Sequence, residues 1–213
     1  MEDVKEKIVA SARVLFAQNG CKRITMDEVS NSLRMSKRTL YEQFANKEEL
    51  IKACIDDWNR RLEKEALRIE GITDSPVWRM LFMGKLFQRY GMINQLFLAD
   101  MEKYYPELYN TKLCVPLNLR TEHLKRQLQN ASEQGFFREG IDLGIASMLM
   151  TNCTYHVLNS KAIPIEERTP IIREFMVNYM RGMLTLKAAE EYDNNKERML
   201  KMLEETSFES LRL

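Results

Sequence analysis

A short segment near the N-terminus concentrates side chains that can donate hydrogen bonds to a nucleic acid. Lys37 and Arg38 carry donors that match O6 and N7 of guanine, and the amide of Gln43 matches the edge of adenine. Three neighbours suit phosphate oxygens instead, and these are Thr25, Tyr41 and Lys47. Residues 20–47 hold six basic against three acidic side chains, which gives this segment a local positive charge. The chemistry it predicts is contact with both base edges and phosphates.

Two short helices joined by a tight turn would position these side chains. Thr25 with Glu28 can form a capping box at the start of the first helix. Ser36 is a good N-cap for the second, which would bury Leu40 and Phe44. In a helix-turn-helix, the first helix braces against the DNA backbone and the second reaches base edges. An ordinary charged surface helix has the same spacing, so the pattern alone leaves both interpretations open.

The flanking sequence predicts two longer helices. Apolar residues over Val4–Asn19 follow the spacing of one buried helical face, and Gly20 suits the left-handed residue that ends a helix. Asn46 and Glu49 form a further capping pair, after which a helix is expected from Lys47 to Glu70. Residues 71–75 then form a loop, and Pro76 suits the first turn of the next helix.

The rest of the chain is also predicted to be helical, because its apolar residues keep a helical period between proline and glycine breaks. The periodic stretches are Val77–Tyr104, Leu117–Gln134, Leu143–Ser160 and Ile171–Ala189. After a polar break at 193–195, one or two more amphipathic turns are expected around residues 199–203. We therefore predict an all-α fold. In this fold, an N-terminal three-helix helix-turn-helix DNA-binding domain spans 1–47, and a larger C-terminal helical ligand-binding and dimerisation domain spans 71–213. A helix over 47–70 connects the two domains.

The composition agrees with such a protein and argues against a secreted or membrane-spanning one. The 213 residues are 45% hydrophobic and 30% charged with only 8 Gly and 5 Pro, which is typical of a soluble helical chain with a real core. The net charge of +1 means that any nucleic-acid contact must be local. We find no N-terminal signal core and no apolar run of about 18 residues, so a cytoplasmic protein without membrane contact is expected.

No catalytic or metal-binding motif is found, so we expect neither an enzyme nor a cofactor. The four cysteines, Cys21, Cys54, Cys114 and Cys153, are far apart and form no C-x-x-C pair, so reduced thiols are expected. Cys153 and His156 have helical spacing for two metal ligands, but no third ligand accompanies them. The motifs of metalloproteases, Walker-loop nucleotide binders, serine hydrolases and dinucleotide binders are absent. An all-helical enzyme or carrier is the alternative.

Three segments together resemble the DNA-binding signature of the TetR family of regulators. They are Thr25-Met-Asp-Glu-Val-Ser, Met35-Ser-Lys-Arg-Thr-Leu-Tyr-Glu-Gln-Phe and Asn46-Lys-Glu-Glu-Leu, all within the first quarter of the chain. The resemblance implies that this region binds a double-stranded DNA operator. The DNA-binding residues are then expected to be Thr25, Arg34, Ser36, Lys37, Arg38, Thr39, Tyr41, Gln43 and Lys47.

The chain departs from the family pattern at several positions. Val29-Ser30 stands where Ile-Ala is usual, Arg34 stands in the turn where Gly is usual, and Arg38 stands where small residues are common. A non-glycine residue in the turn is strained if its φ is positive, although Arg34 also offers a phosphate contact. The operator preference is therefore expected to be this chain's own.

The resemblance also implies a homodimer formed by the last two long helices. The sequence permits this through a heptad-like seam, with small residues at Gly144, Ala146 and Ser147 that allow close helix approach. An internal core stripe is the alternative interpretation. The predicted seam residues are Ile172, Phe175, Tyr179, Met183 and Leu186.

By the same resemblance, the middle helices are expected to enclose a pocket for an apolar or amphipathic small-molecule effector, although such stripes also form plain core. The predicted lining is Phe87, Tyr90, Met101, Tyr104, Tyr105, His123, Met148, Tyr155 and His156. The resulting hypothesis is a ligand-responsive repressor that acts as a homodimer on a palindromic operator, with activation left open. The alternative is a family-like protein that acts through protein–protein binding, for example through its C-terminal segment 190–213.

Overall fold

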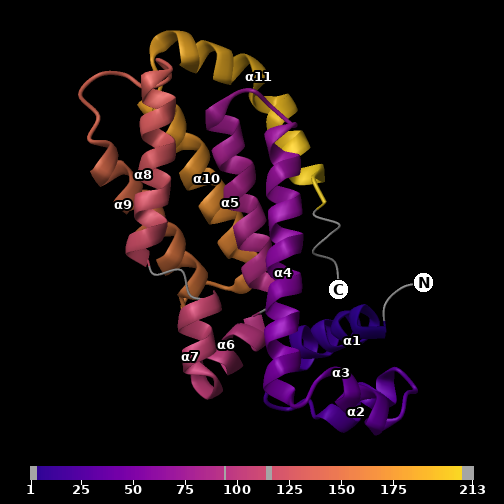
Figure 1. Ribbon diagram of the computed structural model, residues 1–213. Coiled ribbons are helices and arrows are strands. Elements are labelled where there is room, and N and C mark those ends of the chain that lie inside the picture. Colours follow the sequence, from indigo (N-terminus) through magenta and orange to yellow (C-terminus); the bar gives the residue numbers. More distant parts are fainter. Residues whose placement is uncertain (1–3, 94, 114–116, 208–213) are drawn as a thin grey trace. The chain divides into compact units, whose positions relative to one another are not determined.

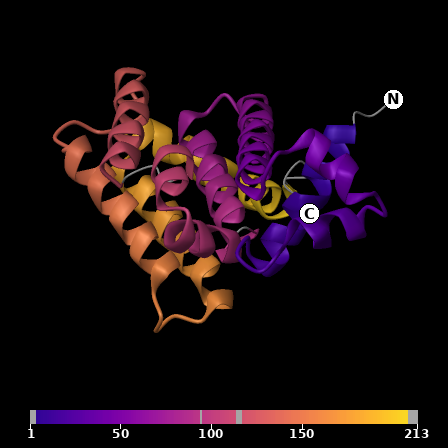
Figure 2. The same ribbon diagram turned by 60° about the horizontal axis from the view of Figure 1, so that its bottom comes forward.

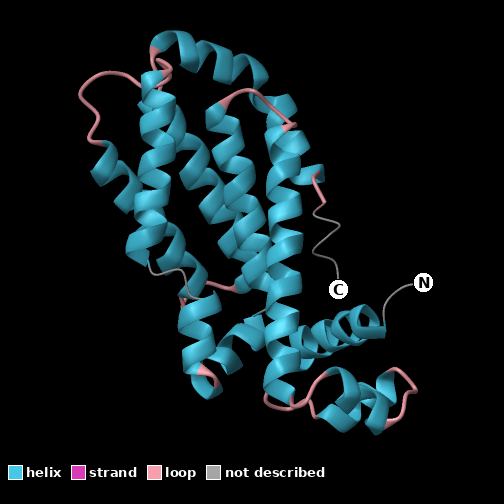
Figure 3. Cartoon of the chain, in the orientation of Figure 1, coloured by secondary structure: helices cyan, strands magenta, loops and turns pink. Residues whose placement is uncertain are grey.

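The computed structural model describes residues 4–93, 95–113 and 117–207, and it confirms the all-α prediction (Figures 1 and 3). Within these ranges the only bridge of β type is an isolated one between Phe137 and Leu184. The helices are α1 (Val4–Asn19), α2 (Met26–Ser32), α3 (Lys37–Gln43), α4 (Lys47–Glu70), α5 (Pro76–Ile93), α6 (Gln95–Tyr104), α7 (Pro106–Leu108), the π-helical η1 (Tyr109–Leu113), α8 (Leu117–Glu133), α9 (Leu143–Asn159), α10 (Ile165–Met183) and α11 (Leu186–Glu205). None of the described helices is both long enough and apolar enough to cross a membrane.

The chain forms two compact units, and α4 and α5 run from one into the other. The first unit comprises residues 1–68, 85–114 and 207–213, and the second comprises 69–84 and 115–206. This division differs from the predicted domains 1–47 and 71–213, because α6 belongs with the helix-turn-helix. Its Phe97 and Met101 are fully buried in the same core as α1 and the lower part of α4.

The core of the first unit joins α1, α2, α3, α4 and α6. Figure 1 shows α2 and α3 at the N-terminal end of α4, with α1 beside them. Phe97 lies at the centre, because its ring stands 6.2 Å from Phe16 of α1 and 4.4 Å from Trp58 of α4. Burying one such large apolar side chain contributes about 1.5–3 kcal/mol. This shared core fixes the position of α3 through Leu40, which is fully buried.

The predicted helix ends of this unit are confirmed. Gly20 has φ +77° after the last residue of α1. The capping box of α2 is formed, since the backbone N–H of Glu28 donates to Thr25 Oγ1 at 3.2 Å and that of Thr25 donates to Glu28 Oε2 at 2.6 Å. Before α4, the backbone N–H of Glu49 donates to Asn46 Oδ1 at 3.0 Å. Because these ends are capped locally, the sequence specified them well.

In the second unit, α9 packs against both α8 and α10 (Figure 2). α11 packs back onto this unit through Tyr192, whose ring stacks on Trp78 with centroids 4.4 Å apart. The Tyr192 hydroxyl donates to the carbonyl of Val177 in α10 at 3.3 Å. Burial, as the main cause, raises the pKa of this hydroxyl above its ordinary range.

Two expectations for the C-terminal third are wrong. The stretch 171–189 is not one helix, because α10 ends at Met183 and the Thr185 side chain caps α11 by accepting from the N–H of Ala188. The expected break at 193–195 is absent, since α11 continues through these polar residues and buries Tyr192, Met199 and Leu203. The end of the predicted segment 190–213, residues 208–213, lies outside the described residues, as does Cys114.

Candidate nucleic-acid interface

The turn between α2 and α3 has a defined geometry. The backbone N–H of Arg34 donates to the Asn31 carbonyl and that of Met35 donates to the Ser30 carbonyl, both at 3.0 Å, which is the pattern of a Schellman motif. Arg34 has φ +53° and is the one non-glycine residue with positive φ among those the structure describes. The backbone strain expected from a non-glycine residue in this turn is therefore present.

α3 begins at the predicted cap and presents a polar outer face. Ser36 Oγ accepts from the backbone N–H of Thr39 at 3.1 Å, and Leu40 is buried on the inner side. Lys37, Arg38 and Tyr41 are all exposed. The structure thus brings these three predicted contact residues together on one short helix whose other side is held by the core.

Both cations of α3 are paired with carboxylates. Lys37 Nζ lies 2.6 Å from Asp27 Oδ2 of α2, and Arg38 Nε lies 2.9 Å from Glu42 Oε1 one turn further along α3. The Arg38 side chain is nevertheless 88% exposed. The two positive charges therefore stay accessible to a ligand from solvent while they are paired.

The other predicted contact residues have structural roles as well. Thr25 caps α2, and the Thr39 hydroxyl lies 2.8 Å from that of Ser36. Lys47 Nζ donates to the carbonyl of Lys22 at 3.2 Å, and partial burial is the main cause that lowers its pKa. Arg34 is exposed and Gln43 is half-buried.

Sequence reasoning missed a contact between α6 and the connection from α1 to α2. The backbone N–H of Lys22 donates to Asp100 Oδ2 at 2.7 Å, and Lys22 Nζ donates to the hydroxyl of Tyr104 at 2.8 Å. A side chain at Gly20 would meet the same carboxylate, since an added Cβ would stand 2.3 Å from Asp100 Oδ2. No sequence signal identifies this contact, because its partners are about 80 positions apart.

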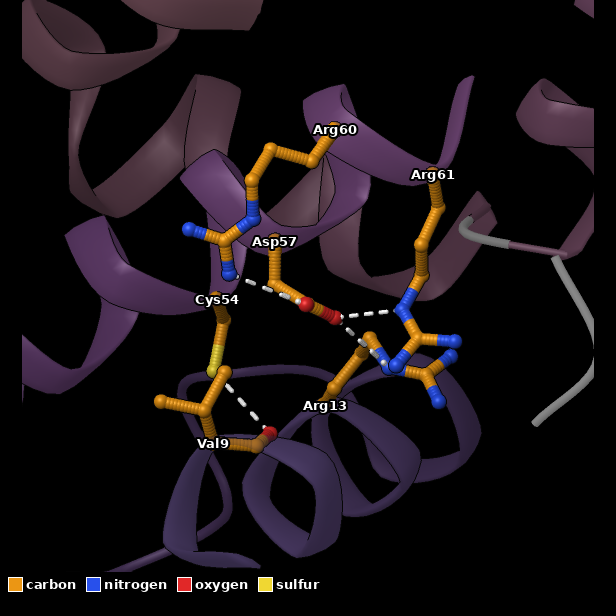
Figure 4. A network of polar contacts seen from close by, with 6 residues as sticks. All are labelled: Val9, Arg13, Cys54, Asp57, Arg60 and Arg61. Atoms are coloured by element: carbon orange, nitrogen blue, oxygen red, sulfur yellow. Dashed lines mark hydrogen bonds and ion pairs between the residues drawn. The ribbon is translucent and has the colours of Figure 1, made fainter. Parts of the chain in front are cut away.

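A second missed feature is the ion-pair network around Asp57, which ties α1 to α4 (Figure 4). Asp57 carboxylate oxygens lie 3.4 Å from Arg13 Nε, 3.2 Å from a terminal nitrogen of Arg60 and 2.6 Å from Arg61 Nε. Beside it, the Cys54 thiol donates to the carbonyl of Val9 at 3.7 Å. Burial lowers the pKa of Arg13, so the carboxylate of Asp57 is what keeps this buried guanidinium compatible with folding.

The predicted effector residues are divided between the two units. In the first unit, Met101 is buried against Cys21, with their sulfur atoms 3.8 Å apart, and Tyr104 holds Lys22. Burial raises the pKa of Tyr90 to about 12. The remaining predicted effector residues of the first unit are Phe87, which is exposed, and Tyr105, which is half-buried. Those of the second unit are all exposed, and they are His123, Met148, Tyr155 and His156.

The second unit contains an open cavity of about 350 Å³ between the 71–75 loop, α5 and α11. Its lining combines Trp78 with polar side chains of α11, including Glu191, Asn195 and Arg198. None of the nine predicted effector residues lines this cavity. The residues predicted to bind the effector therefore do not surround this cavity.

The predicted dimer seam is not a single helical face. Ile172 and Met183 are buried within their own unit, and Leu186, which is 93% exposed, belongs to α11 because the chain turns at residues 184–185. Phe175 and Tyr179 remain half-buried and stack on each other with centroids 5.4 Å apart. Other apolar side chains are exposed on α9 and α10, and they are Ile145, Met148, Leu149, Tyr155, Ile165 and Ile171.

Comparison with known proteins agrees with this geometry. The family model described as bacterial regulatory proteins, tetR family, matches residues 8–54, which contain the helix-turn-helix. The HTH-type transcriptional regulator UidR of Escherichia coli is 26% identical over 163 residues, which cover 74% of this chain and 81% of UidR. The biofilm operon icaADBC HTH-type negative transcriptional regulator IcaR of Staphylococcus epidermidis is 26% identical over 133 residues, which cover 59% of this chain and 62% of IcaR.

A solved γ-butyrolactone receptor, an ArpA-like protein, has the same fold. It superposes with a TM-score of 0.65 over 94% of this chain and 96% of its own, at 19% identity. The fold therefore extends beyond the helix-turn-helix to nearly the whole chain. The match over residues 8–54 and the curated relatives show that the helix-turn-helix region of this chain is similar to that of the tetR family of bacterial regulatory proteins, and that the chain is a DNA-binding regulator of transcription.

Proposed function

We propose that the chain is a ligand-responsive repressor that binds a palindromic operator as a homodimer. The observation that carries this proposal is the exposed cationic face of α3, which the shared core holds at a fixed angle to α2. A short helix held in this way fits the major groove with its N-terminal residues at the base edges. Repression, rather than activation, is supported by the similarity to IcaR, which is named a negative regulator.

In this proposal the residues of the interface divide into two roles. Lys37 and Arg38 read base edges, and Gln43 contacts the edge of an adenine where it reaches one in the groove. The remaining side chains hold the phosphate backbone, which positions the protein without reading sequence. These backbone contacts are Thr25, Arg34, Ser36, Thr39, Tyr41 and Lys47.

The dimer is proposed to form through α9 and α10 rather than through the predicted seam. Leu149 and Tyr155 of α9 and Ile171 of α10 are exposed, and clustered apolar exposure marks interaction surfaces. In a two-fold dimer on a palindromic operator, the two α3 helices would occupy successive major grooves, about 34–36 Å or somewhat more apart.

Effector control is proposed to act through α6. Met101 and Tyr104, two predicted effector residues, contact Cys21 and Lys22 at the start of the helix-turn-helix. A small apolar or amphipathic molecule that prefers a shifted α6 would therefore change operator affinity, and the operator would change effector affinity by the same factor. Because its target is bacterial DNA, we propose that the protein works in the cytoplasm.

Selection of bound fragments from the source genome tests the DNA part of the proposal. Enriched fragments should share a palindrome with half-sites one helical turn, or somewhat more, apart. Fragments that share no sequence, bound equally with random DNA, would contradict it. Adding candidate effectors to the recovered operator complex then tests ligand response, and an operator complex that no effector weakens would leave only the DNA half of the proposal standing.

Sedimentation velocity tests the dimer. Leu149→Glu introduces a charge on α9 and should shift the protein to monomer, whereas Leu67→Glu alters a leucine of α4 that is even more exposed and should leave the dimer intact. A monomeric wild-type protein, or a dimer that tolerates Leu149→Glu, would contradict the proposed interface.

A further inference from the structure

Arg38 is held at one particular nitrogen. Its Nε donates to Glu42 Oε1 at 2.9 Å, and the two residues are one turn apart on the exposed face of α3. A guanidinium has five N–H groups, of which this bond uses only the one on Nε, so the end-on pair of N–H groups, one on each terminal nitrogen, is not used by it. Contact with O6 and N7 of guanine requires two parallel N–H groups of this kind.

From this geometry we propose that Glu42 is a specificity-determining positioning residue for operator recognition. It holds Arg38 through Nε, so that the terminal nitrogens are available to a base edge but disfavoured as partners of phosphates. The inference rests on the proposed reading role of α3.

The pair affects operator and non-operator DNA differently. On the operator, Arg38 contacts guanine through its terminal nitrogens and keeps its bond to Glu42. On other DNA, the gain available to Arg38 is a phosphate contact, and reaching the backbone requires breaking the hydrogen bond from Nε to Glu42. Glu42 therefore weakens non-operator binding more than operator binding, which raises the ratio of the two affinities.

The neighbouring pair of Lys37 and Asp27 provides a matched comparison. It also joins an exposed cation of α3 to a carboxylate, at 2.6 Å. An ammonium is a point charge without a planar fork, so Asp27 has no orientation to impose on it. Removing Asp27 takes the same negative charge from this surface as removing Glu42, but only Glu42 is expected to change discrimination.

The test compares equilibrium binding to two duplexes by fluorescence anisotropy across a salt series. One duplex is the operator that the wild-type protein selects from a randomised library, and the other is its scrambled version. The variants are Glu42→Ala, Glu42→Gln, Asp27→Ala and Arg38→Ala, all at exposed or half-buried positions, with folding checked by circular dichroism. Gln keeps an oxygen that accepts from Arg38 Nε but removes the charge.

Glu42→Ala should lower the operator-to-scrambled affinity ratio about two- to threefold, which is the range an exposed i, i+4 ion pair supports. Its salt dependence on scrambled DNA should steepen by about 0.9 for each Arg38 that gains a phosphate. Glu42→Gln should bind both duplexes more tightly with a ratio close to wild type, and Asp27→Ala should strengthen both alike.

Equal effects of Glu42→Ala and Asp27→Ala on the ratio would overturn the inference, because the carboxylates would then act through charge alone. A Glu42→Gln ratio as low as that of Glu42→Ala would overturn it as well. If Arg38→Ala leaves the affinity ratio unchanged, both the proposed reading role of α3 and the inference about Glu42 fail. If Arg38→Ala lowers the ratio, the reading role of α3 stands, and a negative result for the Glu42 variants then contradicts only the inference about Glu42.

Discussion

Replacement of Asp57 by Asn is expected to destabilise the unit that carries the helix-turn-helix by about 2–4 kcal/mol. Removing one partner of a buried ion pair costs roughly 3–5 kcal/mol, because the other charge is left uncompensated. The side chains of Arg13 and Asp57 are 6% and 14% exposed, so this case applies to them. Arg61 is 32% exposed and recovers part of its solvation in the variant, which brings the expected loss below the upper limit.

The two tryptophans of the chain allow this unit to be followed by itself. Trp58 lies in the core of the first unit, whereas Trp78 lies in the second. In a Trp78→Phe background, Trp58 fluorescence during urea unfolding at fixed protein concentration therefore reports the unit that contains Asp57. The midpoint and slope together give the change in the free energy of unfolding.

Two variants control this measurement. Arg60 pairs with the same carboxylate but is 70% exposed, so Arg60→Ala should cost no more than about 0.5–1 kcal/mol. Arg13→Met in the Asp57→Asn background removes the uncompensated charge and should restore part of the loss. An Asp57→Asn loss as small as that of Arg60→Ala would refute the assignment of this network as the link between α1 and α4.

Three further predictions concern the helix ends. Arg34→Gly should stabilise the unit by about 0.5–1 kcal/mol by relieving the strain of a positive φ, and an unchanged or lower urea midpoint would count against that strain. Gly20→Ala should lower the urea midpoint of its own unit more than Gly135→Ala lowers that of the second unit, because both glycines have positive φ but only the Cβ at Gly20 meets Asp100. Hydrogen bonds from the backbone and side chain of the N-cap residue lower the pKa of Glu28. Its stabilising contribution is therefore complete above about pH 4.3 and is lost as the pH falls through the depressed pKa. The stability difference from Glu28→Gln should shrink over that interval in urea titrations between about pH 3 and 6, and a constant difference would argue against the capping role.

Local signals predicted the N-terminal part of the fold well. The caps at Thr25 and Ser36 and the helix stop at Gly20 each depend on residues within a few positions, and the structure confirms all three. The exposure of Lys37 and Arg38 also followed from the helical period, because burial of Leu40 fixes which side of α3 faces solvent.

Contacts between distant segments could not be predicted in the same way. Arg13 and Asp57, or Lys22 and Asp100, have no sequence pattern that identifies them as partners, since tertiary packing alone brings them together. The apolar spacing through Met183 and Leu186 looked continuous, but periodicity does not register a cap such as Thr185 that starts a new helix. The helical period also cannot distinguish a buried core stripe from a surface that a partner covers.

The central claim is that α3 recognises DNA, and the double variant Lys37→Ala/Arg38→Ala tests it most directly. Its control is Arg198→Ala/Lys201→Ala, which removes the same charge from exposed positions of α11. The measurement is the equilibrium affinity of each protein for the operator that the wild-type protein selects. The account predicts a loss of at least about tenfold for the α3 variant, since each bidentate base contact is worth roughly 1–3 kcal/mol, and little change for the control. Equal affinities of the two variants would contradict it.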